Sequence, residues 1–311
     1  MKLLTRFALL PVAGLVLAAC QGGSPSPAAS ESSAASASAS EAPTGYLARI
    51  IEAGEIKVST DPAYPPQSFL NEDTNELEGF DIDVAKEIAD RLGMEAKFET
   101  PSFDAVVAGG WSNRWDMSVG SVTITPERQQ VLDFTQAYYF TPAQMTVRPD
   151  SGITSLDGLA GKSICVAEST TYQFWLEGTL TLPAEAGEIA EPPADVTVVT
   201  LPTDINCAEA WRDGRNDFDG WLSSSTTVAG AIATGMPVQE VGDPVFYEPL
   251  GAAFDIAIAD NDSLVDAVDR IIGEMHDDGT LSELSKHWFC KDGSYPCENP
   301  DENGLDLTVQ Q

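Results

Sequence analysis

Residues 55–60 read EIKVST, residues 79–93 read GFDIDVAKEIADRLG, and residues 97–100 read KFET. The first and last pieces are short runs of the kind that form strands. In the middle piece, apolar residues recur every three or four positions from 84 to 92, and a glycine follows the last of them. This periodicity predicts a helix that ends at the glycine. Together the three pieces predict a strand–helix–strand unit of a parallel sheet.

The same alternation continues along the chain and then restarts. The further expected elements are a helix at 102–109 capped by Ser102, strands at 116–122, 163–167, 196–201, 218–222 and 237–241, helices at 170–176, 204–213 and 226–233, extended pieces at 143–148 and 245–259, and a final helical region at 263–288. The restart predicts an α/β protein of two lobes. A ligand cleft is expected between the lobes, at the carboxyl ends of the strands.

Two proline-flanked stretches, 144–148 and 242–249, are where the chain is expected to cross between the lobes. The final helices would then return to the first lobe. The predicted divisions are a signal peptide at 1–19, a tether at 20–44, a first lobe at 45–145 plus 246–298, a second lobe at 146–245, and a C-terminal tail at 299–311.

Charge and length exclude several classes of protein. The chain has 311 residues, enough for two packed units and a tail. It carries 16 Lys and Arg against 49 Asp and Glu, a formal net charge of −33. This charge repels phosphate backbones, so nucleic acid is not expected as a partner. Because 43% of the residues are hydrophobic, the chain is still expected to bury a core. The charge favours cationic or zwitterionic solutes only weakly, since salt screens it beyond about 8–10 Å.

The N-terminal segment has the pattern of an export signal. Lys2 and Arg6 are basic, and 7–17 is an apolar stretch too short to span a bilayer comfortably. The stretch ends in small residues before Cys20, which resembles the bacterial lipobox, where this cysteine is lipidated and becomes the new N-terminus. The alternative is an uncut N-terminal anchor. The expected location is therefore the extracytoplasmic face of the cell membrane, facing a periplasm or the cell surface.

The segment after Cys20 reads as a flexible tether. Residues 21–44 hold eight Ser, seven Ala and three Pro, and no aromatic residue. Such a composition buries too little apolar surface to fold. As a flexible chain of this length it would reach roughly 25–30 Å, enough to hold a domain away from the lipid headgroups.

Four cysteines remain after the lipobox. Export permits disulfides, and four thiols allow three connectivities. Proximity in the sequence favours Cys290 with Cys297, and Cys165 with Cys207. A zinc site is the alternative, but the sequence has no CxxC and its two histidines lie on the expected final helix. Neither a metal nor another cofactor is therefore expected.

Four motifs follow one another in the first half of the chain: DPAYPP at 61–66, EGFDIDVA at 78–85, DMSVGSVTITPER at 116–128 and DFTQAYY at 133–139. In this order, behind a lipobox and a tether, they resemble the motifs of family 3 solute-binding proteins, the receptors of polar amino acid ABC importers. The resemblance runs from about residue 55 to residue 288. It implies a two-lobed, hinge-bending periplasmic-binding-protein fold of type II, acting as a monomer.

The resemblance also implies a carboxylate-binding site. Arg128 matches the residue that binds the ligand's α-carboxylate, which a planar guanidinium can meet with two parallel hydrogen bonds. Ser121 and Thr123 would add hydroxyl and backbone contacts beside it. From the second lobe, Thr171 would contact the carboxylate, with Thr170 next to it. Alternatively, Arg128 is a surface arginine, and the two threonines only cap their helix.

Aromatic residues are expected to hold the aliphatic part of the ligand. Tyr64 and Phe69 occupy the family's positions in the loop after the first strand, and core packing is the alternative for both. Four tryptophans are further candidates, although a tryptophan is more often structural: Trp111, Trp115, Trp175 and Trp221.

The sequence departs from the family pattern at two places. The family commonly has Gly where this chain has Ser169, which leaves the loop geometry there open. The family also usually places an Asp after the strand that begins near Asp217, to pair with the α-ammonium, and the matching position here is Leu222 or Ser224. The acids that could replace it are Asp61, Glu168 and Asp219.

These observations predict capture rather than chemistry. The chain is expected to bind a small polar solute, an amino acid or related carboxylate, and to deliver it to ABC permease subunits. The alternatives are a ligand-sensing lipoprotein and an enzyme on the same scaffold, such as a dehydratase. An enzyme would need a positioned acid or base in the cleft, and the sequence shows neither a nucleophile elbow nor a histidine near the motifs.

Overall fold

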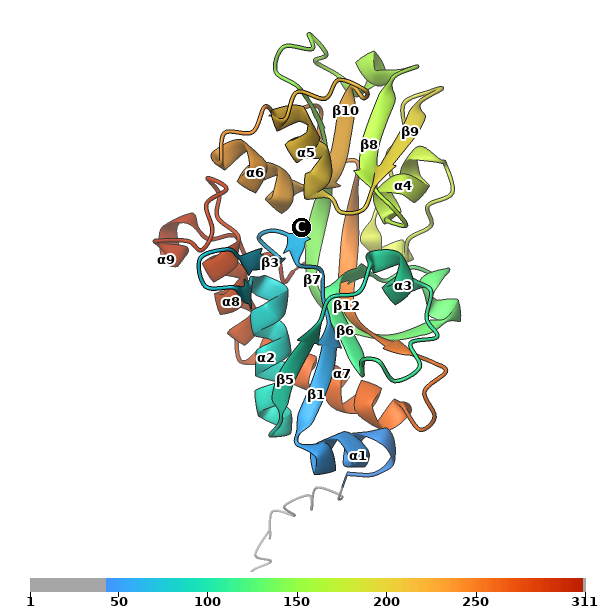
Figure 1. Cartoon of the computed structure of the whole chain (residues 1–311), viewed down its shortest axis with the longest axis vertical. Coiled ribbons are helices and arrows are strands. Elements are labelled where there is room, and N and C mark those ends of the chain that lie inside the picture. Colours follow the sequence, from blue (N-terminus) through green and yellow to red (C-terminus); the bar gives the residue numbers. More distant parts are fainter. Residues whose placement is uncertain (1–42, 310–311) are drawn as a thin grey trace, which may run out of the picture. The chain divides into compact units, whose positions relative to one another are not determined.

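The computed structural model describes residues 43–309 (Figure 1). The predicted signal peptide, Cys20 and all but the end of the tether lie outside these residues. The helices are α1 Gly45–Ala53, α2 Phe80–Leu92, α3 Phe103–Val107, α4 Thr171–Leu176, α5 Ile205–Arg212, α6 Ser225–Ala233, α7 Asp262–Asp277, α8 Thr280–Trp288 and α9 Pro300–Asn303. Short 3₁₀ turns occupy Arg128–Gln130, Leu156–Leu159 and Ala184–Ala186. The strands are β1 Glu55–Ser59, β2 Ala63–Tyr64, β3 Ser68–Asn71, β4 Glu76–Glu78, β5 Glu95–Glu99, β6 Met117–Thr123, β7 Leu132–Val147, β8 Ser163–Ala167, β9 Thr197–Leu201, β10 Gly220–Ser224, β11 Gln239–Glu240 and β12 Phe246–Asp255.

The main sheet is mixed, with strand order β5-β1-β6-β12-β7-β10-β8-β9, and β11 pairs with β7. Strand β1 is parallel to β5 and β6, and β8 is parallel to β9 and β10. These pairings confirm the predicted parallel units in both halves of the chain. The long strands β7 and β12 are antiparallel to each other and lie between the two parallel sets. A small antiparallel sheet, β2-β3-β4, follows β1.

Strands β7 and β12 connect the two lobes, as the cartoon shows (Figure 1). The first part of β7 pairs with β12, and its last five residues, from Ala143 to Val147, pair with β10. Ala143 lies opposite both Phe246 and Ser224, so the change of partner occurs there. The first crossing thus comes slightly earlier than the predicted stretch 144–148, whose residues up to Val147 already belong to the second set of strands.

Each lobe has its own apolar core. The largest buried cluster draws its residues from 46–139 and 250–307, and two further clusters draw theirs from 143–246. Helix α2 shows why the sequence folds this way. Its predicted apolar stripe, including Val84, Ile88 and Ala89, is buried, and Gly93 ends the helix in a left-handed conformation with φ 73°. Both features were visible in the sequence.

Some predicted elements differ from the structure. The helical region at 263–288 is two helices, because Gly279 between α7 and α8 adopts a φ of 85° that interrupts the helix. The strand expected at 237–241 is reduced to the two residues of β11. Ser102 precedes α3 as expected, but its side chain makes no capping hydrogen bond.

The predicted C-terminal tail packs on the first lobe over its described part. The Phe140 N–H donates to the Leu307 carbonyl at 2.7 Å, and the Leu305 N–H donates to Phe289 at the same distance. Leu307 is buried within the core of the first lobe. None of the helices in residues 43–309 is both long and apolar enough to cross a membrane.

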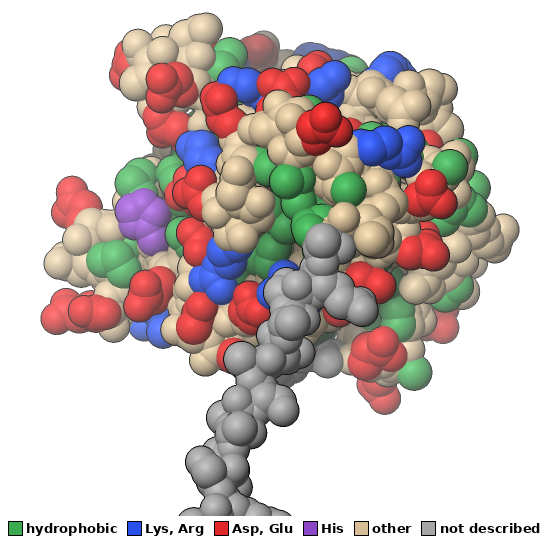
Figure 2. Space-filling model, turned by 90° about the horizontal axis from the view of Figure 1, so that it is seen from below, with side chains coloured by type: hydrophobic (Ala, Val, Ile, Leu, Met, Phe, Trp, Pro, Cys, Tyr) green, Lys and Arg blue, Asp and Glu red, His purple; other side chains and the backbone are tan. Residues whose placement is uncertain are grey.

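Carboxylates dominate the charged surface. On the face shown in Figure 2, Asp and Glu side chains are spread widely and outnumber Lys and Arg. This distribution agrees with a net charge of −33 carried on the outside of a chain with a regular core.

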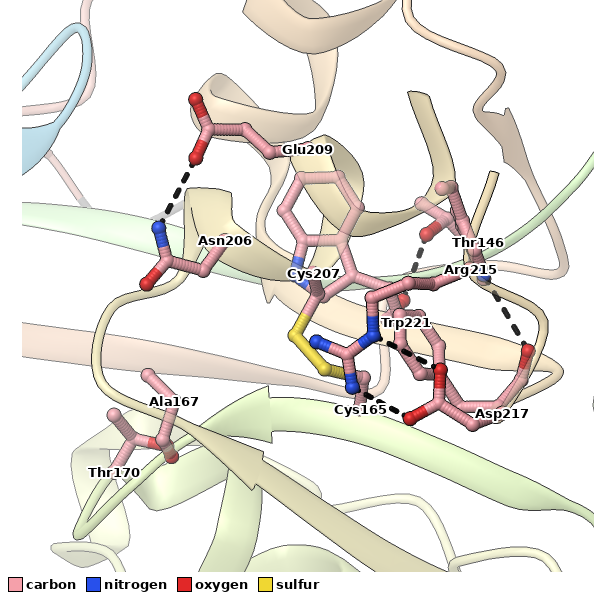
Figure 3. The surroundings of a disulfide bond; sticks show 12 residues. Thr146, Cys165, Ala167, Thr170, Asn206, Cys207, Glu209, Arg215, Asp217 and Trp221 are labelled. Atoms are coloured by element: carbon pink, nitrogen blue, oxygen red, sulfur yellow. Dashed lines mark hydrogen bonds and ion pairs between the residues drawn. A yellow bond between two sulfur atoms is a disulfide. The ribbon is translucent and has the colours of Figure 1, made fainter. Parts of the chain in front are cut away.

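The four cysteines of the folded part lie in the two pairs that proximity favours. The sulfurs of Cys165 and Cys207 are at bonding distance, as are those of Cys290 and Cys297. The Cα separations of 5.9 and 5.6 Å suit disulfides. Figure 3 shows the first pair joining β8 to α5, close to the Trp221 ring.

Candidate functional site

A cavity lies between the lobes. Its walls come largely from loops that follow parallel strands, the place where α/β proteins bind ligands. The lining residues are Asp61, Tyr64, Phe103, Gly120, Ser121, Thr123, Arg128, Ala167, Thr170, Thr171, Tyr172, Pro202, Asp204 and Glu248. The structure thus brings together seven of the eight ligand-site residues that the sequence predicted. The exception is Phe69.

Arg128 lies in the cavity wall and not on the surface. Its side chain is only 4% exposed. One guanidinium nitrogen, Nη1, donates to the Thr123 carbonyl at 2.9 Å, and Nη2 donates across the lobes to the Ser169 carbonyl at 3.1 Å. The guanidinium also lies over the Phe103 ring, 5.3 Å from its centroid. Burial lowers the pKa of Arg128 to about 10, an effect that the charge of Glu248 partly offsets.

Glu248, on β12, lies between the hydroxyl groups of Thr123 and Thr171. Its Oε1 accepts a hydrogen bond from Thr123 Oγ1 at 2.8 Å and another from Thr171 Oγ1. The residue is 2% exposed, and burial raises its carboxyl pKa, while the hydroxyls and the Arg128 charge act in the opposite direction. The two threonines predicted to bind a ligand carboxylate therefore bind a carboxylate of the protein in this structure.

Ser121 is held by a network behind the cavity. Its hydroxyl donates to Asp81 at 2.7 Å, and Tyr138 donates to the other oxygen of Asp81 at 2.8 Å. Tyr139 is 2.6 Å from the Ser121 hydroxyl. The backbone of Ser121 has a φ of 54°, a conformation that costs energy for a residue with a side chain. The network explains how that conformation is maintained at the ligand-facing end of β6.

The acids of the cavity are Asp61, Asp204 and Glu248. Asp61 follows β1, and one of its oxygens accepts a hydrogen bond from the Ala63 N–H at 2.8 Å. Asp204 precedes α5 and is 7% exposed. Burial raises the pKa of both carboxyls, and the neighbouring charges of Asp61 and Glu248 raise that of Asp204 further. No cluster of three His, Cys, Asp or Glu side chains in residues 43–309 is arranged to hold a metal ion.

Of the two aromatic residues expected to hold the ligand, one lies in the cavity wall. Tyr64 lines the cavity, and its hydroxyl lies 3.3 Å from that of Tyr172 in the other lobe. Phe69 points elsewhere, because it packs edge-on against Trp288 and Tyr295, with ring centroids 6.0 and 5.4 Å away. The four candidate tryptophans are also buried in the cores rather than in the cavity wall.

Of the positions considered for an acid that binds the ligand's ammonium group, most lie outside the cavity wall. Leu222 is a core residue of the second lobe, and Ser224 caps α6 while accepting a hydrogen bond from Gln67 of the first lobe at 3.0 Å. Glu168 is exposed, and Asp219 lies near Lys162, 3.8 Å away, outside the cavity wall. Of the three proposed substitutes, only Asp61 lines the cavity.

The order of the four motifs predicted a family, and comparison of the chain with known proteins confirms that family. The model of the bacterial extracellular solute-binding proteins, family 3, matches residues 56–291. The chain belongs to this family. The L-cystine-binding protein TcyJ of Escherichia coli K12 is 30% identical over 251 residues, which are 80% of this chain and 87% of that protein. The histidine-binding periplasmic protein of the same organism is 28% identical over 245 residues, 75% of this chain and 87% of that protein.

Solved structures of related proteins confirm the fold class. The ancestral amino acid-binding protein AncCDT-1, a precursor of cyclohexadienyl dehydratase, aligns with a TM-score of 0.66 at 26% identity, over 78% of this chain and 99% of that one. An ancestral arginine-binding protein bound to arginine aligns with a TM-score of 0.64 at 28% identity, over 76% and 98% of the two chains.

In this family 3 solute-binding protein, the structure shows the backbone conformation at one departure from the family pattern and adds two acids to the expected site. Ser169, where the family commonly has Gly, adopts a φ of 62°, a region that glycine enters more easily. Asp204 and Glu248 were not predicted as site residues. A signal existed for each: Asp204 follows the carboxyl end of a predicted strand, and Glu248 is an acid among the apolar residues Phe246, Tyr247, Pro249 and Leu250.

Proposed function

We propose that this chain is the substrate-binding lipoprotein of an ABC importer. It binds a small polar solute with a carboxylate, an amino acid or a related compound, and delivers it to permease subunits. The observation that carries this proposal is Arg128, a buried guanidinium in an interlobe cavity whose Nε has no hydrogen-bond partner among the described residues. Relatives named for binding cystine, arginine and histidine support the solute class.

Capture would occur by closure of two lobes, residues 45–145 plus 246–298 and residues 146–245. The packing of 299–309 on the first lobe supports adding them to it. Contacts between the lobes, such as Arg128 with the Ser169 carbonyl and Gln67 with Ser224, support a closed arrangement of the cavity. A ligand favours closure only if the closed state gives it contacts that the open state cannot.

A thermal-shift screen of the purified chain tests the function. Amino acids, polyamines and small carboxylates are the compounds to compare. A solute present at 100 times its Kd should stabilise the protein by about 2.7 kcal/mol, which raises the melting temperature measurably. If no compound in these classes shifts the melting transition, the solute-binding proposal loses its support.

An enzymatic role is the second candidate, since the cavity holds a buried acid. Burial raises the carboxyl pKa of Asp204, which is the condition for a general acid near neutral pH. The structurally similar ancestral protein AncCDT-1 is named as a precursor of cyclohexadienyl dehydratase. NMR spectra of each stabilising solute, recorded before and after incubation with the protein, separate the two roles. We expect the solute to be recovered unchanged.

Lipidation at Cys20 is a further part of the proposal, and mass spectrometry of the membrane fraction tests it. The expected species begins at Cys20, carries a lipid, and contains disulfides Cys165–Cys207 and Cys290–Cys297. Only reduction should make these four thiols available to alkylation. The matched control is Cys20→Ser, which should abolish the lipid. A mass that retains residues 1–19 would show an uncut anchor instead.

A further inference from the structure

The charges around the cavity do not balance. Its lining contains three carboxylates, Asp61, Asp204 and Glu248, and one cationic side chain, Arg128. Glu248 already opposes the Arg128 charge, because each affects the pKa of the other in the direction expected for opposite charges. The remaining two acids face the cavity without a cationic partner in its wall. Buried carboxylates are costly unless a cation or a proton accompanies them.

Asp204 is the acid best placed to bind a ligand. It is 7% exposed, and its Oδ1 has no hydrogen-bond partner within the part of the chain that the structure describes. The nearby Ser223 hydroxyl and Ala167 N–H only partly offset the effect of burial on its pKa. A buried, unpartnered carboxylate oxygen in a cavity wall is a suitable acceptor for an ammonium group.

The second lobe holds Asp204 in place. Cys207 follows it by three residues at the start of α5, and the bonded Cys165 lies on β8, two residues before Ala167 (Figure 3). Ala167 itself lines the cavity. The sulfur link therefore joins the element that carries Asp204 to the strand whose end forms the neighbouring wall. Such cross-linking limits the movement of the carboxylate away from the ligand.

We infer that Asp204, with Asp61 beside it, forms a cation subsite, and that the captured solute carries a net positive charge with a primary ammonium bound to Asp204. The inference rests on the proposed solute-binding function. Asp204, which precedes α5, would take the role of the acid that is missing near Leu222 and Ser224. A basic amino acid would place its carboxylate at Arg128 and its ammonium groups at the two acids, whereas a diamine would use the acids alone.

Calorimetric titration distinguishes these solutes. The probes are L-lysine, putrescine, L-glutamine and L-glutamate, titrated into the purified chain. We expect L-lysine or putrescine to bind at least 10-fold more tightly than L-glutamine, and L-glutamate to bind most weakly. Tighter binding of L-lysine than of putrescine identifies a basic amino acid, and the reverse order identifies a diamine.

The variant Asp204→Asn keeps the shape of the side chain and removes its charge. It should weaken binding of the preferred net-positive probe about 10- to 100-fold, the range for a hydrogen bond to a charged group. The control is Glu168→Gln, which removes the same charge from an exposed residue in the loop between β8 and α4. This variant should change the affinity less than about threefold. Asp61→Asn serves as a second variant if Asp204→Asn does not fold.

Two results would overturn the cation subsite while leaving solute binding intact. One is a wild-type preference for L-glutamine or L-glutamate over both net-positive probes. The other is an affinity of Asp204→Asn for its cationic probe that equals the wild-type value. If neither these probes nor any compound of the wider screen binds the wild-type chain, both the subsite and the proposed function fail.

Discussion

Replacing Arg128 with alanine is expected to reduce the affinity for a carboxylate-bearing solute by about 100-fold or more. Each hydrogen bond between a guanidinium and a carboxylate contributes about 1.5–3 kcal/mol, and two are lost together. The melting temperature should change little, since the environment disfavours the buried charge and lowers the pKa of Arg128 to about 10. Removing that penalty offsets the loss of its contacts with Thr123 and Ser169. Calorimetric titration and thermal unfolding measure the two quantities.

Two control variants test whether the loss of affinity is due to the guanidinium of Arg128. Arg128→Lys keeps the charge but loses the two-point geometry, so its affinity should lie between those of the wild type and the alanine variant. Arg270→Ala removes a guanidinium that is 62% exposed on α7, and should leave affinity unchanged. Wild-type affinity in Arg128→Ala for a solute with a carboxylate would refute the role given to this residue.

The sequence was most informative where structure is local. The helix at 80–92 followed from its apolar spacing and its terminal glycine, and its bounds agree with α2. The region at 263–288 shows the limit of this reasoning. The pattern predicted one helical region through residue 288, but the left-handed backbone of Gly279 divides the segment into two helices. Periodicity reports which face is buried and says little about backbone direction at a single glycine.

The expected site residues that come from one motif reach the same cavity. Arg128, Ser121 and Thr123 lie within eight residues, and all three line the cavity. Asp204 and Glu248 reach the same cavity from residues 76 and 120 positions further along the chain than Arg128. Their proximity depends on strand order and on the crossing of β12, which local patterns do not encode. The place of Phe69 outside the cavity wall has a related reason, because its partners, Trp288 and Tyr295, come from the opposite end of the chain.

The hydrogen-bond network behind Ser121 contributes to the free energy of unfolding by an amount that depends on pH. Asp81 is fully buried on the first turn of α2 and accepts hydrogen bonds from Ser121 and Tyr138. Burial raises its carboxyl pKa to about 7, and the two hydrogen bonds offset only part of that effect. The folded protein therefore keeps a proton on Asp81 that the unfolded chain releases near pH 4. The folded state binds more protons than the unfolded state across this interval.

Between about pH 4 and pH 7, Asp81 is expected to lower the free energy of unfolding as the pH rises, by up to about 4 kcal/mol. Above pH 7 both states have lost the proton, and the contribution becomes constant. The variant Asp81→Asn cannot titrate, so its stability relative to the wild type should increase across the same interval. Denaturant unfolding at a series of pH values measures the difference. Asp90→Asn, which removes an exposed carboxylate from the same helix, controls for the change in charge. Parallel stability profiles for the wild type and Asp81→Asn would show that Asp81 is ionised in the folded protein throughout.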